Sequence, residues 1–500
     1  MKMNNLIILP ILIPLMAGII LLFLKEQVQI QRWISGIATI FNVLVVMLLV
    51  HTVSLNGIQV IELGSWPAPF GIVLVADMFA ALLVLTTMVV GLACLFYAFH
   101  SIGEAREKNY FYAFFQFILV GVAGSFLTGD IFNLFVMFEV MLISSYALIT
   151  LGGTRQQLRE SIKYILINIV SSVLFVASVA YLYGVIGTLN FAHLSVRVAS
   201  LDDPQGGIIS VVAILFLIVF SLKAGLFLYF WLPGSYSVPP AVIAALFGGL
   251  LTKVGIYAIF RIFTLIFYHE PSITHFTIMA WMAGITMVIG MIGAIAHWDV
   301  KKILAYNIVY AVGFIIFGLA IFNQVALEGA IFYLLHDMFV KALLFLLAGA
   351  MIGIAGTSYL KNMGGLIKNH PMLGWMFFIA ALALAGVPPL SGFIGKLLIV
   401  QGGLTDGFYW LVGLSLLTSL LILYSIMKIF MNGFWGEVKL SKEEQKASAK
   451  GLLAPCAFLL ILSIGLGLGA EWVYDQYIRE AAITLLDPAI YIDAVSPVKE

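Results

Sequence analysis

Five ionisable side chains stand inside long apolar runs of this sequence, far from any charged loop: Glu139, Lys223, Lys253, His336 and Lys396. If these runs cross a bilayer, each such group costs several kcal/mol unless it is paired or hydrated, so each is a candidate functional residue. One acid, three lysines and a histidine can all take up and release protons. Because most of them are bases and they occupy five different runs, the set favours proton transfer over binding of Na⁺.

The positions of Glu139 and Lys253 argue that both are deep. Glu139 is nine residues into the apolar run 130–150, which places it roughly 13 Å below the surface of a core about 30 Å thick. Lys253 is some thirteen residues into the run 240–264. The alternative for Glu139 is a packing role with Ser and Tyr hydroxyls, but neither side chain is expected to reach water by snorkelling.

Lys223 and Lys396 each lie near a predicted break in a helix. Prolines follow the first lysine and precede the second, at Pro233, Pro239 and Pro240 and at Pro388 and Pro389. A broken helix is tolerated in a membrane where it lines a cavity, and breaks at matching places in two halves indicate internal repeats. We expect the first break about two turns after Lys223; the alternative for this lysine is snorkelling.

Further ionisable residues in the apolar runs have less certain roles. His336 titrates near neutrality, as a proton relay requires, although a buried histidine is also common as a hydrogen-bonded core residue. Asp337 and Lys341 are four residues apart and form a predicted ion pair. Arg261 shares a helix face with Lys253, and snorkelling to the outer surface would equally explain it. We expect Lys428 to snorkel to the cytoplasmic surface, and His297, Lys301 and Lys302 to be solvated in a loop.

The composition excludes a soluble protein and several kinds of site. Hydrophobic residues make up 63% of the chain and charged residues 10%, whereas a soluble chain carries about 25% charged residues. The cysteines, Cys94 and Cys456, both lie in apolar runs, so no disulfide framework is expected. Neither a clustered metal site, a cofactor-binding motif nor a nucleophile with its base is present, and we predict no metal, cofactor or enzymatic activity.

Apolar runs long enough to span a membrane predict an all-α polytopic protein of about fourteen helices. The expected spans are 5–24, 33–54, 77–99, 111–128, 130–150, 163–185, 208–231, 240–264, 277–296, 303–322, 328–354, 373–400, 408–432 and 451–470. The segment 470–486, beyond the last span, is expected to be an amphipathic helix on the membrane or on a neighbouring subunit.

Basic residues alternate between the predicted loops as the positive-inside rule requires. Fifteen lie on one side: Lys25, Arg32, Arg106, Lys108, Arg155, Arg159, Lys163, Lys301, Lys302, Lys361, Lys368, Lys439, Lys442, Lys446 and Lys450. Four lie on the other side: Lys2, Arg197, Arg479 and Lys499. The first side is therefore expected to be cytoplasmic, with both chain ends outside the cytoplasm.

Several stretches resemble the antiporter-like membrane subunits shared by respiratory complex I and the Mrp sodium/proton antiporters. They are LLTKVGIYAIFR, HWDVKKILAYNIVYAVGF, HDMFVKALLFLLAG and AGVPPLSGFIGK. The strings TGDIFNLFVMFEVMLISSYALITLGG and WLPGSYSVPP are closer to the MrpD-type subunits of the Mrp antiporters. The complex I subunits usually have histidines on both sides of this Trp-Leu-Pro, where this chain has Phe227, Tyr229 and Gly234 to Tyr236.

The resemblance implies a fold and a division of the chain. It implies two inverted five-helix repeats, at 111–264 and 277–432, preceded by three helices in 1–110. The segment 433–500 would hold a cytoplasmic loop, the last helix and the outer tail. It also implies that Glu139 pairs with Lys223, that Lys253 is central and that His336 and Lys396 complete the relay. The spacing to Lys341 is one residue longer than in many relatives.

The function implied is that of a proton-translocating subunit of a Na⁺(cation)/H⁺ antiporter in the bacterial inner membrane. Its partners would be the other Mrp subunits (A, B, C, E, F and G), H⁺, Na⁺ indirectly and the lipid bilayer, with no nucleic acid. Three alternatives stay open. They are a proton-pumping subunit of complex I or of a membrane-bound hydrogenase, a stand-alone carrier for an organic solute, and a non-transporting scaffold.

Overall fold

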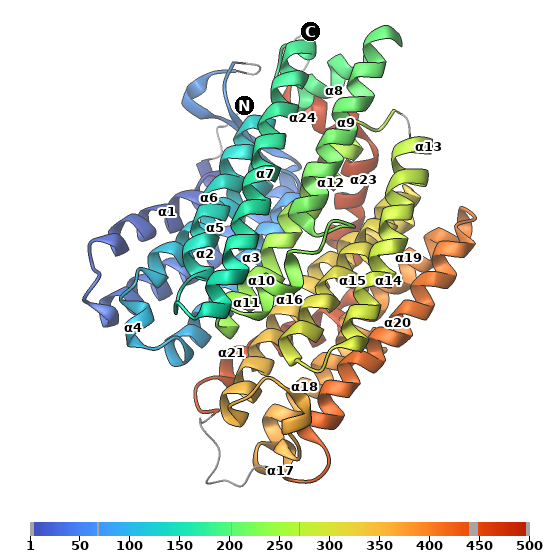
Figure 1. The fold of residues 1–500 in the computed structure, drawn as a ribbon. Helices are drawn as coiled ribbons and strands as arrows, with labels where there is room; N and C mark the ends of the chain where they lie inside the picture. Colours follow the sequence, from blue (N-terminus) through green and yellow to red (C-terminus); the bar gives the residue numbers. More distant parts are fainter. Residues whose placement is uncertain (1–4, 68–69, 202, 270, 440–448, 497–500) are drawn as a thin grey trace.

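Long helices lie side by side in a single bundle, and both chain ends lie at the same end of it (Figure 1). The structure is a computed structural model that describes residues 5–67, 70–201, 203–269, 271–439 and 449–496. Four of the basic residues that set the expected orientation, Lys2, Lys442, Lys446 and Lys499, lie outside the described residues. The predicted all-α fold is confirmed, with one small addition near the N-terminus.

The N-terminal part holds three long helices and a β-hairpin that the sequence did not lead us to expect. Its elements are η1 (Asn5–Ile7), α1 (Leu9–Leu22), α2 (Val28–Asn56), β1 (Gln59–Glu62), η2 (Leu63–Ser65), β2 (Val73–Ala76), α3 (Met78–Ser101) and α4 (Glu104–Glu107). The strands pair antiparallel, with Gln59 opposite Ala76. Because every residue of β2 is buried, its apolar side chains read as part of the following helix in the sequence.

The next elements cover the first expected repeat. They are α5 (Phe111–Leu127), α6 (Ile131–Ile149), α7 (Arg155–Ile186), α8 (Phe191–Ala199), α9 (Asp203–Ala224), α10 (Leu232–Ser237), α11 (Ala241–Leu246), the π-helical turn η3 (Phe247–Leu251) and α12 (Thr252–Leu265). Side chains cap the starts of the helices: Asp130 accepts hydrogen bonds from two amides of α6, and Thr154 accepts one from α7. Such caps satisfy amides that a helix leaves unpaired.

The remaining elements cover the second expected repeat and the C-terminal part. They are α13 (Pro271–Ile273), η4 (Thr274–Met279), α14 (Ala280–Ala296), α15 (Val300–Ile321), α16 (Gln324–Ala355), η5 (Leu360–Asn362), α17 (Leu366–Asn369), α18 (Pro371–Ala385), α19 (Ser391–Thr405), α20 (Tyr409–Ile429), η6 (Phe430–Phe434), α21 (Leu453–Leu468), α22 (Ala470–Val473), η7 (Tyr474–Ile478), α23 (Arg479–Leu486) and α24 (Pro488–Val495). The helix α16 lies at the centre, where it packs against α15, α19, α11, α21 and α3.

Each of the fourteen expected spans coincides with a helix. Ten helices in the described part of the chain are long and apolar enough to cross a membrane, and the bent pair Leu453–Leu468 and Ala470–Leu486 makes an eleventh. Three further apolar helices are shorter, at Leu9–Leu22, Phe111–Leu127 and Pro371–Ala385. The chain is therefore a multi-pass membrane protein, as its hydropathy predicted.

The first broken helix breaks earlier than predicted. Helix α9 ends at Ala224, and Gly225 takes a left-handed φ of +77°, so the break directly follows Lys223 rather than beginning two turns later at the prolines. The Gly225 amide donates to the Ser221 carbonyl, and the Trp231 indole donates to the Leu222 carbonyl at 2.9 Å. A glycine at this place therefore ends the helix, since a left-handed φ is readily available to it.

The second break agrees with the prediction, and a third was not predicted. Helices α18 and α19 are separated at residues 386–390, which include the cis peptide bond Pro388–Pro389. The third separates α21 from α22, with a bend of 79° between Leu453–Leu468 and Ala470–Leu486. A Cβ on Gly467 would lie 2.5 Å from the Pro389 carbonyl oxygen, so the second and third breaks are packed together.

The expected amphipathic tail is neither a membrane-surface helix nor a neighbour-binding helix. Residues 470–486 pack against α16, α12 and α3 of the same chain, and Ile478, Ala481, Ala482 and Leu485 are buried. This prediction was wrong because a short helix with one apolar face looks the same in sequence whichever surface covers that face.

Close packing at the first break generates a testable prediction. A Cβ on Gly255 of α12 would lie 2.6 Å from the Ala224 backbone nitrogen, so Gly255→Ala must displace the end of α9. We expect a loss of about 1–3 kcal/mol in the free energy of unfolding, typical of overpacking, measured as a lower unfolding temperature of the purified protein in detergent. Gly413→Ala is the matched control, because a Cβ there meets nothing within 4 Å; equal destabilisation by both variants would contradict the prediction.

Candidate functional site

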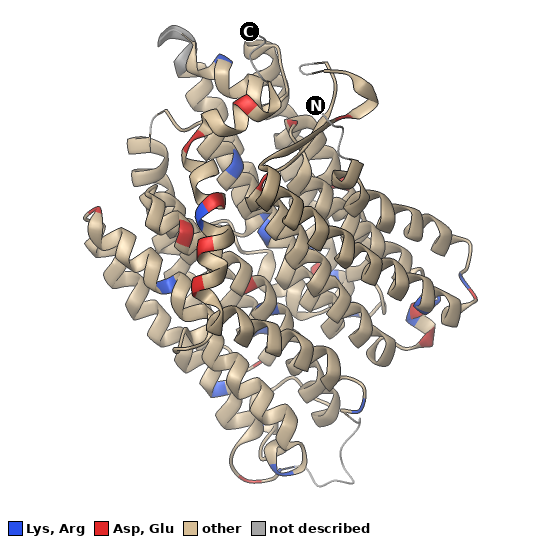
Figure 2. Ribbon diagram, turned by 180° about the vertical axis from the view of Figure 1, so that it is seen from behind, with Lys and Arg blue, Asp and Glu red and all other residues tan. Residues whose placement is uncertain are grey.

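Charged residues are sparse within the bundle, where acidic and basic positions stand among long uncharged stretches (Figure 2). The five candidate relay residues come from five helices: α6, α9, α12, α16 and α19. Lys253 and His336 are fully buried, and Lys223 and Lys396 are exposed by 4% and 9%. Glu139 is half-buried. The structure therefore places all five on helices inside the bundle or at its lateral face, each with the partners described below.

Glu139 and Lys223 are joined through a third residue. The Lys223 ammonium donates to the Ser172 hydroxyl at 3.0 Å, and the Ser172 hydroxyl donates to the Glu139 carboxylate. The expected pairing of the two charges is thus indirect, because Ser172 of α7 stands between α6 and α9. Lys223 also lies 5.6 Å from the centre of the Phe138 ring, a favourable position for a cation.

Lys253 forms a buried ion pair that the sequence did not lead us to expect. Its ammonium lies 2.7 Å from one Asp337 carboxylate oxygen and donates to the Gly248 carbonyl at 2.7 Å. The other Asp337 oxygen lies 3.5 Å from the Lys341 ammonium, which confirms the predicted Asp337–Lys341 pair. One carboxylate therefore neutralises two lysines in a region where all three side chains are fully buried.

His336 and Lys396 lie beside the second break. The His336 Nδ1 is 2.7 Å from the Ser391 hydroxyl, which in turn is 3.0 Å from the Ser463 hydroxyl of α21. The Lys396 ammonium donates to the Ala385 carbonyl at 2.9 Å and to the Ser419 hydroxyl at 2.6 Å. Since Ala385 is the last residue of α18, this lysine binds a carbonyl that the break leaves free.

Aromatic rings surround the Lys396 ammonium. The ring centres of Tyr310, Phe314 and Tyr333 lie 5.8, 5.7 and 5.9 Å from it. Tyr333 also packs against His336, with ring centres 5.4 Å apart. The two candidates therefore share one aromatic wall although they lie on different helices.

Arg261 does not snorkel to the surface. Its guanidinium lies 2.5 Å from the Asp77 carboxylate, and the two side chains are exposed by 2% and 1%. The rings of Tyr491 and Tyr257 stand 5.1 and 5.4 Å from it. The sequence reasoning missed Asp77; its place directly before an apolar run is typical of a helix cap, and it does cap α3.

Lys428 and Lys301 are not free cations at the surface either. Lys428 donates to the Ile295 and His297 carbonyls at 2.7 and 2.6 Å and is exposed by only 6%. Lys301 donates to the Pro239 carbonyl at 2.7 Å. Both expectations of solvated ends were wrong, because free carbonyls beside each lysine offer a partner at the edge of the membrane.

Two further buried acids lie away from the candidate relay. Glu107 binds both the Nε and the Nη2 atoms of Arg32 at 2.9 Å and accepts from the Tyr112 hydroxyl at 2.5 Å. Glu328 accepts from Gln324 and from Tyr474 at 2.9 and 2.5 Å. Glu107 is part of a charged loop sequence and therefore gave no signal of burial.

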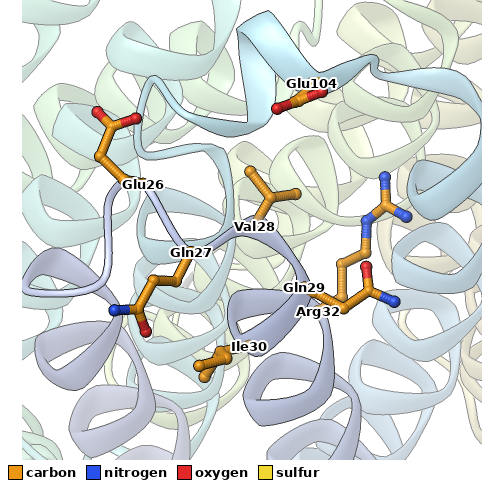
Figure 3. A pocket seen from close by; sticks show the side chains of 7 residues that line it. All are labelled: Glu26, Gln27, Val28, Gln29, Ile30, Arg32 and Glu104. Atoms are coloured by element: carbon orange, nitrogen blue, oxygen red, sulfur yellow. The ribbon is translucent and has the colours of Figure 1, made fainter.

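A polar recess of about 430 Å³ lies near the Arg32–Glu107 pair. Figure 3 shows the side chains that line it, from the start of α2 and from α4: Glu26, Gln27, Val28, Gln29, Ile30, Arg32 and Glu104. None of the five candidate relay residues lines it. Across the described ranges, no three His, Cys, Asp or Glu side chains come together in a way that could hold a metal ion.

Comparison with known proteins gives a consistent result. The family described as "NADH:quinone oxidoreductase/Mrp antiporter, TM" matches residues 128–463. The D-type polypeptide of the Na(+)/H(+) antiporter of Bacillus subtilis (strain 168) is 54% identical over 494 residues, covering 99% of both chains. Its counterpart from Alkalihalophilus pseudofirmus is 53% identical over the same length, again covering 99% of both chains.

The chain belongs to the NADH:quinone oxidoreductase/Mrp antiporter family. A solved structure of the Mrp complex from Dietzia sp. DQ12-45-1b contains a chain with a TM-score of 0.90 and 29% identity, covering 99% of this chain and 100% of that one. The resemblance to the MrpD-type subunits, predicted from the sequence, is confirmed. As a member of this antiporter family the chain is a membrane transport subunit rather than an enzyme.

The buried Asp77–Arg261 pair of this family member generates a second testable prediction. Asp77→Asn keeps a capping oxygen for α3 but leaves the Arg261 charge uncompensated, which should cost about 3–5 kcal/mol of stability. The measurement is the unfolding temperature of the purified protein. Asp475→Asn is the control, because its pair with Arg479 is 3.5 Å long and more than half exposed and should contribute at most about 1 kcal/mol.

The double variant Asp77→Asn with Arg261→Met separates charge from shape. Removing both charges leaves no buried ion to compensate, so we expect much of the lost stability to return. A double variant that is less stable than Asp77→Asn alone would show that the pair does not act through its charges.

Proposed function

We propose that this chain is a proton-translocating membrane subunit of a multisubunit Na⁺(cation)/H⁺ antiporter. The observation that carries the proposal is that each of the five ionisable groups inside the apolar bundle contacts a carboxylate, a hydroxyl or a free carbonyl. The curated relatives named as Na(+)/H(+) antiporter subunits support the same function. Since mid-membrane charges have no use in a scaffold, the partners of these groups favour transport.

The proposed proton route runs laterally through Glu139, Lys223, Lys253, His336 and Lys396, with hydrated half-channels connecting its ends to the two aqueous phases. Two contacts support its continuity. The ends of α9 and α12 meet closely between the first two lysines, since Gly255 packs directly on Ala224. Asp337, which binds Lys253, is the chain neighbour of His336. Tyr333 then packs against both His336 and Lys396.

Charge pairing would act as the switch in this route. While Glu139 is ionised, it stabilises the charged form of Lys223 through Ser172. When the pair separates, a lone ammonium in the apolar interior favours release of its proton toward Lys253. Asp337 would hold Lys253 charged in the resting state and share this role with Lys341, while the breaks next to Lys223 and before Lys396 supply the moving parts.

The half-buried position of Glu139 supports an assembly with other subunits. Exposed apolar side chains flank it on α6 and α7, including Phe132, Ile143 and Val173 at 44%, 59% and 64% exposure. A carboxylate that faces lipid at mid-bilayer is costly, so a neighbouring subunit is expected to cover this face. We propose the other Mrp subunits (A, B, C, E, F and G) as the partners, in the bacterial inner membrane with both termini outside the cytoplasm.

We also propose that residues 111–264 and 277–432 act as two inverted repeats. The first would hold Glu139, Lys223 and Lys253, and the second His336 and Lys396. Each contains one broken helix beside a lysine, at 225–231 and 386–390. Transfer between Lys253 and the α16 side chains would then be the step between the repeats.

The proposed function predicts that transport requires the assembled complex. The chain would be expressed alone and together with its neighbouring operon subunits in antiporter-deficient cells, and Na⁺-dependent pH changes would be measured in inverted vesicles. We expect activity only after co-expression. Activity of the chain alone would favour a stand-alone carrier, and proton movement that requires an electron donor would favour a complex I or hydrogenase subunit.

The relay predicts that Lys223→Ala abolishes Na⁺-dependent proton exchange in the same vesicles without preventing assembly, because no other charged group can take its place next to Ser172. Assembly is measured by co-purification of the subunits. Lys368→Ala, which removes an exposed lysine of α17, is the control and should leave exchange unchanged. Wild-type exchange by Lys223→Ala would refute the relay.

A further inference from the structure

The hydroxyl of Ser172 stands between the two charged groups at the start of the proposed route. It accepts a hydrogen bond from the Lys223 ammonium at 3.0 Å and donates one to the Glu139 carboxylate. The three residues come from three helices, α7, α9 and α6. Within the described part of the chain, no direct ion pair joins Glu139 to Lys223, and Ser172 is the hydrogen-bond partner that both share.

The surroundings leave this hydroxyl as the favoured path between the two charges. On the lysine side, Phe138 lies 5.6 Å from the ammonium and packs against Phe175 and Phe220. These rings offer no proton acceptor. A hydroxyl, by contrast, is donor and acceptor at once, and a chain of hydrogen bonds through it can move a proton without moving any heavy atom.

We propose that Ser172 is a proton-transferring residue that carries protons between Lys223 and Glu139. This inference rests on the relay proposed above and names a further residue in it. In the transfer, the Lys223 N–H bond breaks as its proton forms a new O–H bond with Ser172. At the same time the original Ser172 proton passes to the Glu139 carboxylate. The products are a neutral amine, a neutral carboxylic acid and an unchanged hydroxyl, so atoms and charge balance.

The geometry also limits the route to one proton at a time. After the transfer the Ser172 proton points toward the Lys223 nitrogen, and the Glu139 acid donates to the Ser172 oxygen. A second transfer in the same direction therefore needs the hydroxyl to rotate and both end groups to exchange their protons with the next sites. The serine rotor thus couples each proton to a reset of the Glu139–Lys223 switch.

The test compares Ser172→Ala with Ser172→Thr in the co-expressed complex, by Na⁺-dependent proton exchange in inverted vesicles. Ala removes the hydroxyl with little change in volume, and we expect exchange to fall about 100-fold, the lower range for a positioned proton-transfer group. Thr keeps a hydroxyl, so we expect it to retain most of the exchange. The unfolding temperature should stay unchanged in both variants.

Ser178→Ala is the matched control, because Ser178 lies on the same helix and its hydroxyl binds only the Leu174 carbonyl, at 2.8 Å. It should leave exchange unchanged. Full exchange by Ser172→Ala would overturn the inference, as would equal losses in the Ala and Thr variants. Glu139→Gln and Lys223→Ala are run in parallel: if they too retain exchange, the relay itself fails, whereas if they abolish it while Ser172→Ala does not, only the role of Ser172 fails.

Discussion

The high cost of an unsolvated charge in an apolar bundle is the constraint on which this structure depends. Every ionisable group of the proposed route answers it with a specific partner from another part of the chain. Asp337 neutralises Lys253 and Lys341, and Ser172 links Lys223 to Glu139. The helices that carry these groups are therefore held in place by polar contacts as well as by packing.

Interrupted helices supply the partners that carboxylates do not. A helix that ends inside the membrane leaves carbonyls without amides, and cations lie close to several such ends. Lys396 binds the Ala385 carbonyl at the end of α18, and Lys428 binds the Ile295 and His297 carbonyls after α14. Because a helix C-terminus carries partial negative charge, the breaks stabilise lysines without fixing them in a permanent ion pair.

Two kinds of polar contact therefore divide the work of the bundle. The Asp77–Arg261 pair is short, enclosed by tyrosine rings and distant from the proposed route along the chain, and it suits a fixed support of the outer end. The contacts of Lys223, His336 and Lys396 go mainly to serine hydroxyls. A hydroxyl can exchange donor and acceptor roles, which a proton route needs and a structural ion pair does not.

The sequence by itself determined the spans, two of the three breaks and the identity of the relay candidates, since hydropathy, prolines and buried charge are local properties of the chain. It also predicted the Asp337–Lys341 pair, whose partners are one helical turn apart. The partners of Lys253, Arg261 and Lys223 were decided by the tertiary structure alone. Asp77 and Arg261 are 184 positions apart, and no local pattern tells which distant side chain will pack beside a given helix face. The bend after α21 escaped prediction for the same reason, because the surface that covers residues 470–486 belongs to helices elsewhere in the chain.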